Sequence, residues 1–405
     1  MPLPWLVAAA KKSSNPFRPG VIRVKKEAVK NSSWSFTEPQ IQAKIKEGTE
    51  LVKNVTLGVG DEKIPYTEKR IRSGESISVS SQKFSDYERE IALVLLHQKS
   101  GKLDVVKIVK RGGQLVSPPG YQINVVERMN GIKWNHWATQ YKVVSPKDTI
   151  VILNKYPVEA NGTIEYFVYS PFSNDLAHPE ILKEGARYLN EVVERARKDL
   201  RDHQVMSRSV PGKLVIDVLP ADFFKHLPFL EQSDLLEALW DSDYAINRVL
   251  GTLGSNKDKA WTLSSNYAGA NGWVQFTDNW KRGKPGTYSS IARLYPMAKL
   301  NPNFKEGAAD HVNSMKAAIL LYDNNLGLLV KEFGTDIAQN SKLDEFLAAA
   351  YNGPPSKVIS SLNQSGSTAT ATRSNWFEGL FAETEGYIAK LRLLKEKQVP
   401  QKYLD

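Results

Sequence analysis

The sequence has no cysteine among its 405 residues. A disulfide framework and a thiolate metal site are therefore both excluded. The six histidines give no metal-binding spacing either. Asp310 and His311 are neighbours and point to different faces of a helix, while His203 and His226 have no partners at suitable positions along the chain. We expect no metal and no other cofactor.

Several signatures of nucleotide and nucleic-acid chemistry are also missing. The sequence contains no phosphate-binding loop, no dinucleotide fingerprint and no serine nucleophile elbow. It also lacks the spacing of a zinc finger or a helix-turn-helix motif. We therefore expect no nucleic-acid partner.

Long apolar runs are lacking as well. The opening MPLPWLVAAAKKSS has an apolar segment of about eight residues, which is too short to span a bilayer. Its lysines follow the apolar residues, the reverse of the order in a secretory signal. The segment is compatible with the stub of a trimmed export signal or anchor, so the location has to be inferred from function.

Basic residues are concentrated in the first part of the chain. Residues 1–150 hold 25 Lys and Arg against 14 Asp and Glu, while the whole chain has a net charge of +10. The remainder is therefore almost neutral. A basic surface attracts polyanions without choosing among them. Acidic lipid headgroups, an anionic cell-wall polymer and another envelope partner all stay open as binding partners of this half.

The pattern of residues 49–172 is that of a β-rich domain. Short β-branched and aromatic runs alternate with Gly, Pro, Asp and Asn, which is typical of an all-β sandwich or small barrel. The expected strands contain SISVS, EIALVLLH, LDVVKIVK, YQINVVER, ATQYKVV, TIVILN and TIEYFVYS. Residues 1–48, rich in Lys, Ser and Pro with one helical pattern near Gln40 to Leu51, are expected to form a flexible basic arm or trimmed anchor.

Helical periodicity begins after Pro171 and continues to the end. A long amphipathic helix that starts at Pro179 is expected to connect the two domains over residues 173–214. Its apolar face contains Ile181, Tyr188, Leu189, Val192, Val193 and Ala196. Residues 215–405 are expected to form an all-helical domain, with helices over about 221–231, 234–253, 287–294, 305–332, 342–351 and 376–397. The predicted fold class is therefore α+β with more than one domain.

Three motifs follow one another in the helical part. AGANGWVQF, residues 268–276, surrounds Gln275 with small and apolar residues, which permits close approach by a ligand or by another helix. AAAYNGPP at residues 348–355 and AETEGYIAKLRLL at residues 382–394 come next. Each motif alone is also explained by ordinary helix packing.

In this order and spacing the motifs resemble those of lytic transglycosylases of the soluble type, which have a lysozyme-like all-helical fold and cleave peptidoglycan. The resemblance covers roughly residues 215–397. It implies that the substrate is a peptidoglycan glycan strand, that the product is a 1,6-anhydro sugar, and that the protein acts in the cell envelope. It also implies a set of substrate-binding residues: Gly272, Gln275, Tyr351, Asn352, Glu383 and Tyr387.

The catalytic acid departs from this pattern. At the register where the family usually has its Glu, this chain has Lys257 beside Asp258. Further upstream, Glu231 ends the apolar run DFFKHLPFLE, as the family's acid does, and residues 233–262 would then be an insertion. Burial among apolar side chains would raise the pKa of such a carboxyl, as a general acid requires. We predict Glu231, with Asp258 and a lost acid as alternatives.

The resemblance implies a mechanism with one Glu, which acts first as acid and then as base for the substrate's own C6 hydroxyl. If Asp234 or Asp241 instead faces Glu231 across the cleft, hydrolysis by water is expected. Two other functions stay open at this point. One is a catalytically inactive peptidoglycan-binding protein, and the other is a structural scaffold of an envelope machine.

Overall fold

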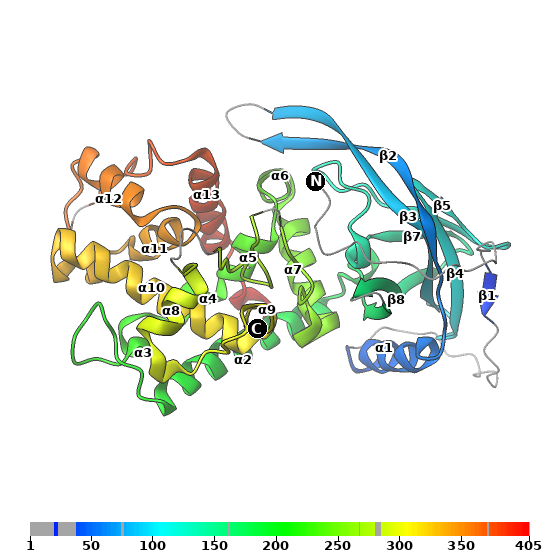
Figure 1. The fold of residues 1–405 in the computed structure, drawn as a ribbon, viewed down its shortest axis with the longest axis horizontal. Coiled ribbons are helices and arrows are strands. Elements are labelled where there is room, and N and C mark those ends of the chain that lie inside the picture. Colours follow the sequence, from blue (N-terminus) through cyan, green and yellow to red (C-terminus); the bar gives the residue numbers. More distant parts are fainter. Residues whose placement is uncertain are drawn as a thin grey trace. The chain divides into compact units, whose positions relative to one another are not determined.

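The computed structural model describes residues 20–22, 38–73, 77–160, 163–266, 268–279, 285–370 and 372–404. Strands occupy the N-terminal part and helices the C-terminal part (Figure 1), and 47% of the chain is helical against 22% in strands. The chain divides into two compact units. One comprises Met1–Gly185 with Leu250–Lys257, and the other Ala186–Val249 with Asp258–Asp405. The predicted separation of a β-rich from a helical part is confirmed.

The first unit is built on a seven-stranded antiparallel sheet with the order β1-β4-β3-β8-β9, in which β2 also pairs with β3 and β5 with β4. Its strands are β1 (Gly20–Ile22), β2 (Val59–Ser73), β3 (Ile77–His97), β4 (Leu103–Arg111), β5 (Gln114–Val116), β8 (Thr149–Ala160) and β9 (Thr163–Tyr169). β6 (Gln122–Val125) and β7 (Tyr141–Ser145) form a separate two-stranded sheet. Since no pairing in the described part joins β1 to β9, the large sheet is open and the barrel prediction is wrong.

Both faces of this sheet are covered. Side chains alternate along β3, so that Val94 and Leu96 pack against α1 (Glu38–Val52), whereas Leu93 and Leu95 belong to a second core with residues of β6 and β7. α1 lies along one face of the sheet (Figure 1), and its Ile41 is 1% exposed. The arm predicted over residues 1–48 is therefore wrong for residues 38–48. The rest of that arm lies outside the described residues, except for β1.

β2 and the first half of β3 form a two-stranded ribbon. Residues 63–73 pair with residues 77–87, whereas β4 pairs with β3 only from Arg89 and β8 only from Ala92. In the described part of the chain, the ribbon therefore has no strand neighbour on either side over most of its length. We did not predict β2 as a strand, because its sequence VGDEKIPYTEKRIRS is polar on both faces.

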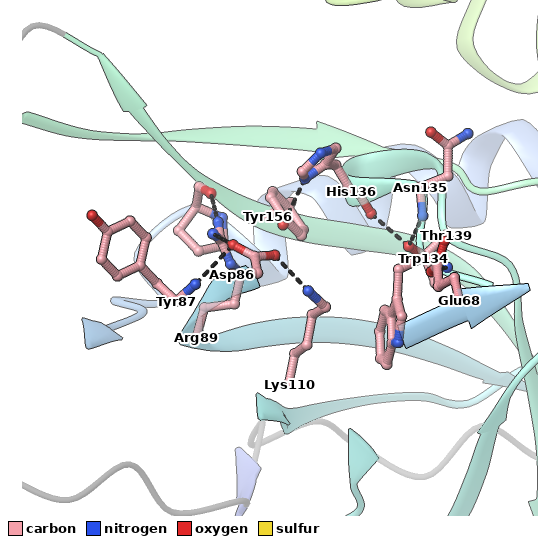
Figure 2. Close-up of polar contacts among 11 residues, drawn as sticks. Glu68, Asp86, Tyr87, Arg89, Lys110, Trp134, Asn135, His136, Thr139 and Tyr156 are labelled. Carbon is pink, nitrogen blue, oxygen red and sulfur yellow. Dashed lines mark hydrogen bonds and ion pairs between the residues drawn. The ribbon is translucent and has the colours of Figure 1, made fainter. Parts of the chain in front are cut away.

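Buried charges hold the base of the ribbon (Figure 2). Asp86 is bound by Arg89 at 2.5 Å and by Lys110, and Arg89 also donates to the carbonyl oxygen of Pro157 at 3.2 Å. Burial opposes ionisation of Asp86, but the two cations outweigh it and hold the pKa of this carboxyl below its usual range. The other acidic side chain drawn, Glu68, accepts a hydrogen bond from the Trp134 amide at 2.9 Å.

The second unit is helical, and α10 (His311–Phe333) is its central element. It contacts most of the helices around it, and its inward side chains, including Ile319, Leu320 and Leu326, are fully buried. The surrounding helices are α3 (Val215–Val218), α4 (Asp222–Lys225), α5 (Leu227–Gln232), α6 (Leu235–Trp240), α8 (Thr287–Leu294), α9 (Phe304–Ala309), α11 (Leu343–Asn352), α12 (Pro355–Gln364) and α13 (Ala382–Glu396). α2 (Pro179–Asp202) and α7 (Ser242–Asn256) contribute residues to both units.

The predicted long helix is α2, and all six of its predicted apolar residues are buried. α12 was not predicted, although Pro355 at its first turn is a favourable helix start. In the part of the chain that the structure describes, no helix combines the length and the apolar character of a membrane span.

Candidate active site

Glu231 lies in the last turn of α5. This short helix has Pro228 in its first turn, and its apolar residues Leu227, Phe229 and Leu230 are buried in the core. The Oε1 atom of Glu231 accepts a hydrogen bond of 2.7 Å from the Tyr387 hydroxyl on α13. Two residues that we predicted from motifs far apart in the sequence therefore meet in one place.

The environment of Glu231 favours its protonated form. The Glu231 side chain is half-buried. Burial raises the pKa of Glu231 to about 7, against the Tyr387 hydrogen bond and the Lys390 charge, which lower it; the Glu383 charge adds to the rise. A carboxyl that still holds its proton near neutral pH meets the requirement for a general acid.

Three tyrosines surround this carboxyl. Tyr322 on α10 and Tyr351 on α11 have ring centroids 5.7 Å apart, and Tyr387 comes from α13. Burial, and then the Glu231 charge, raise the pKa of all three phenols. Their hydroxyls therefore remain hydrogen-bond donors. Tyr351 donates to the Val274 carbonyl oxygen at 2.7 Å, so this predicted sugar contact also supports the adjacent loop.

Residues 268–276 form a tight turn that contacts the end of α5 through Gln232. Gly272 has φ of 76°, a left-handed conformation, and a Cβ atom added there would lie 1.9 Å from the Ala308 carbonyl oxygen. No larger residue fits without moving α9. Packing against another helix thus accounts for the glycine, and a substrate contact at Gly272 stays a prediction.

Gln275 is half-buried and is held within the same turn. Its Nε2 atom donates to the Gly272 carbonyl oxygen at 2.7 Å and to Ser264 Oγ at 3.2 Å, and its Oε1 atom accepts from Asn266 at 3.2 Å. A sugar bound by Gln275 would have to share or replace these hydrogen bonds.

Gln232, the residue after Glu231, joins α5 to this turn. Its Nε2 atom donates to the Trp273 carbonyl oxygen at 2.7 Å and to that of Gly272 at 3.3 Å. Trp273 is itself fixed, because its indole donates to Ser314 Oγ at 2.8 Å and stacks on His311 at 4.3 Å between centroids. We did not predict a role for Gln232, and its position directly after the acid is the signal that could have indicated one.

The last two motifs also meet. Asn352, at the end of α11, accepts a hydrogen bond of 2.9 Å from Thr384 Oγ1 in the first turn of α13. Glu383 is exposed, and within the described residues it has no hydrogen bond or ion pair. It lies one turn before Tyr387 on the same helix. Glu383 therefore acts on Glu231 through its charge and is open to solvent.

The other candidate carboxylates are placed differently. Asp234 accepts from the Leu236 amide at 2.8 Å as the N-cap of α6, and Asp241 accepts from the Tyr244 amide at 2.9 Å near the start of α7. Both therefore serve helix ends. Asp258 is exposed, in a short 3₁₀ turn that directly follows α7.

Asp310 and His311 both have structural roles. Asp310 caps α10 by accepting from the Asn313 amide at 2.7 Å. His311 lies 2.7 Å from the Ala260 carbonyl oxygen through Nε2 and 3.0 Å from the Tyr188 hydroxyl through Nδ1. A carbonyl can only accept, so Nε2 carries the proton. Burial lowers the pKa of His311 to about 4. Among the described residues, no three His, Asp or Glu side chains are grouped to hold a metal ion.

No protein-family model matches this chain, and comparisons with curated proteins and with solved structures give no match either. The interpretation of the site therefore rests on its geometry.

Proposed function

We propose that the C-terminal unit is a peptidoglycan lytic transglycosylase that uses Glu231 as its single acid and base. The observation that carries this proposal is the 2.7 Å hydrogen bond between Glu231 and Tyr387, together with the pKa of about 7 that burial gives to the carboxyl. Residues of all three sequence motifs lie near Glu231 or its neighbour Gln232, and this supports the same function.

In the first step, protonated Glu231 gives its proton to the glycosidic oxygen between N-acetylmuramic acid and N-acetylglucosamine. The bond from C1 to that oxygen breaks, and the oxygen leaves with the electron pair and the proton. The Tyr387 hydroxyl donates to the carboxylate that remains. The positive charge that develops at C1 lies on the muramic acid.

In the second step, the Glu231 carboxylate takes the proton of the C6 hydroxyl of the same muramic acid. The freed oxygen forms a bond to C1 and closes the 1,6-anhydro ring. Glu231 ends the cycle protonated, and no water is consumed. The engagement of Asp234 and Asp241 at helix ends supports a mechanism without a second carboxylate.

We further propose that the N-terminal unit binds an anionic polymer of the cell wall through one face of the ribbon. Residues directly opposite each other in the paired strands share a face. On this face lie Lys63, Lys69 and Lys83, which we call the lysine face, together with Thr67, Ser81, Ser85 and Tyr87. The three lysines are exposed, and none has an ion-pair partner in the described part of the chain.

The acidic residues within the paired segments 63–73 and 77–87 support this assignment, because they lie on the other face. Glu68 and Asp86 belong to the opposite face, where Glu68 pairs with Arg70 at 3.2 Å and Asp86 pairs with Arg89 and Lys110. A face whose paired residues include lysines and hydroxyls and no carboxylate suits a polyanion. Both proposals place the protein in the cell envelope.

The test of the catalytic proposal is mass spectrometry of the soluble products after incubation with purified peptidoglycan. The parent should release anhydro-muropeptides, and Glu231→Gln should release none. Reducing-end products would indicate a hydrolase with a second carboxylate. Equal cleavage by the variant would refute the assignment of the acid, and an absence of products from both would leave an inactive wall-binding or scaffold protein.

A further inference from the structure

Lys390 is a buried cation beside the acid. It lies on α13, one turn after Tyr387, and is 8% exposed. Its Nζ atom donates to the Leu230 carbonyl oxygen and, at 2.9 Å, to that of Ser233. These two carbonyls lie on either side of Glu231 in the chain.

The end of α5 is held by a second cation as well. The last carbonyls of a helix have no partner within it, and α5 has only six residues. The Arg248 guanidinium donates to the Gln232 carbonyl oxygen at 2.6 Å and to Glu237 at 2.6 Å. Two buried cations therefore fix the backbone that carries Glu231.

We propose that Lys390 is a positioning residue of the reaction: it holds the backbone on both sides of Glu231 and keeps a positive charge beside its carboxyl group. This inference rests on the proposed role of Glu231 as the acid. A neutral donor could satisfy the same two carbonyls. The proposal therefore gives the positive charge of Lys390 a role beyond capping the helix.

The groups that face Glu231 show why the charge matters. Tyr387, Lys390 and Glu383 face it from α13, Tyr322 from α10 and Tyr351 from α11. Among these groups Lys390 supplies the one positive charge. Each charge affects the ionisation of the other group. Burial lowers the pKa of Lys390, and the Glu231 charge opposes that shift.

This charge assists the first step of cleavage. When Glu231 gives up its proton, a carboxylate forms beside the Lys390 ammonium, and the attraction between them stabilises it. Without the ammonium, Glu231 would be a weaker acid and would hold its proton to higher pH. The upper limit of the active pH range would then move upward while the maximal rate falls.

The test compares Lys390→Gln, which keeps a donor without the charge, with Lys390→Arg, which keeps the charge. A matched control is Lys155→Gln in the other unit. Lys155 is 3% exposed and donates to the carbonyl oxygens of Val52, Lys53 and Val55 at the end of α1. It is therefore also a buried lysine that caps a helix, but it belongs to the unit that does not contain Glu231.

The titration of Glu231 is followed by carbon NMR of the labelled carboxyl, assigned with Glu231→Gln, and the pH profile of product release is measured beside it. We expect Lys390→Gln to raise the midpoint by at least about half a pH unit, roughly threefold in proton affinity, and Lys390→Arg and Lys155→Gln to keep that of the parent. An unchanged midpoint in Lys390→Gln overturns the proposal. Because the NMR titration needs no turnover, this result is distinct from a failure of the proposed activity.

Discussion

Replacing Glu231 by Gln should stabilise the protein at alkaline pH and leave its stability at acidic pH almost unchanged. The pKa of Glu231 is raised from 4.5 to about 7 in the folded state, so the folded chain binds this proton more tightly than the unfolded chain. The resulting stabilisation is fully present below pH 4.5 and is lost as the pH rises through 7. Gln does not ionise, and its Oε1 atom still accepts from Tyr387.

The size of the effect follows from the two pKa values. They differ by about 2.5 pH units, and each unit corresponds to about 1.4 kcal/mol. The parent should therefore lose about 3 kcal/mol relative to the variant between pH 4.5 and pH 8. Because the side chain keeps some contact with water, we expect the measured difference to lie nearer 2 kcal/mol.

The assay is urea unfolding of parent and variant at pH 5 and pH 8, followed by tryptophan fluorescence. The variant should gain stability relative to the parent at pH 8, and the gain should persist in high salt, since salt screens surface charges far more than buried ones. If the free energies of unfolding of variant and parent differ by the same amount at both pH values, Glu231 ionises as an ordinary surface carboxyl. The argument for a general acid would then fail.

Three further predictions concern single features of the site and the ribbon. Tyr387→Phe removes a hydrogen bond that lowers the pKa of Glu231, so the upper limit of the cleavage pH profile should rise. Asp86→Ala leaves Arg89 and Lys110 buried without their carboxylate and should cost about 3 to 5 kcal/mol in urea unfolding. Replacing the three lysines of the lysine face with Gln should weaken sedimentation with cell walls at low salt. The control is a triple Gln variant of Lys53, Lys99 and Lys142, three other exposed lysines of the same unit. Equal weakening of sedimentation by this control would refute specific binding by the lysine face.

The helices were the most predictable part of the fold. Apolar periodicity and Pro179 predicted α2, and the expected helix over residues 287–294 is α8. The ribbon was not predictable in the same way. SISVS and EIALVLLH were expected to be separate strands, but EIALVLLH and the described residues 77–80 of SISVS belong to β3, because pairing with β2 carries the strand across the polar residues between them. Such pairing is a non-local interaction that no local pattern encodes.

The helix near Gln40 to Leu51 shows a second limit. Its pattern predicted α1, yet we assigned part of it to a flexible arm. An amphipathic helix docks only where a complementary apolar surface exists, and that surface is formed here by alternate residues of β3, β4 and β8. The sequence of the helix alone does not reveal it.

The contacts that hold Glu231 in place were the part of the candidate site that was hardest to predict from the sequence. A lysine or arginine in an amphipathic helix is normally predicted to be solvated, but Lys390 and Arg248 are buried and bind carbonyls at the end of α5. Arg248 lies within residues 233–262, the segment that separates the acid from the turn in the sequence. Removing that segment would leave the Gln232 carbonyl without this donor. The segment therefore forms part of the framework around Glu231, and the long separation of Glu231 from Gly272 in the sequence is compatible with the proposed role of Glu231.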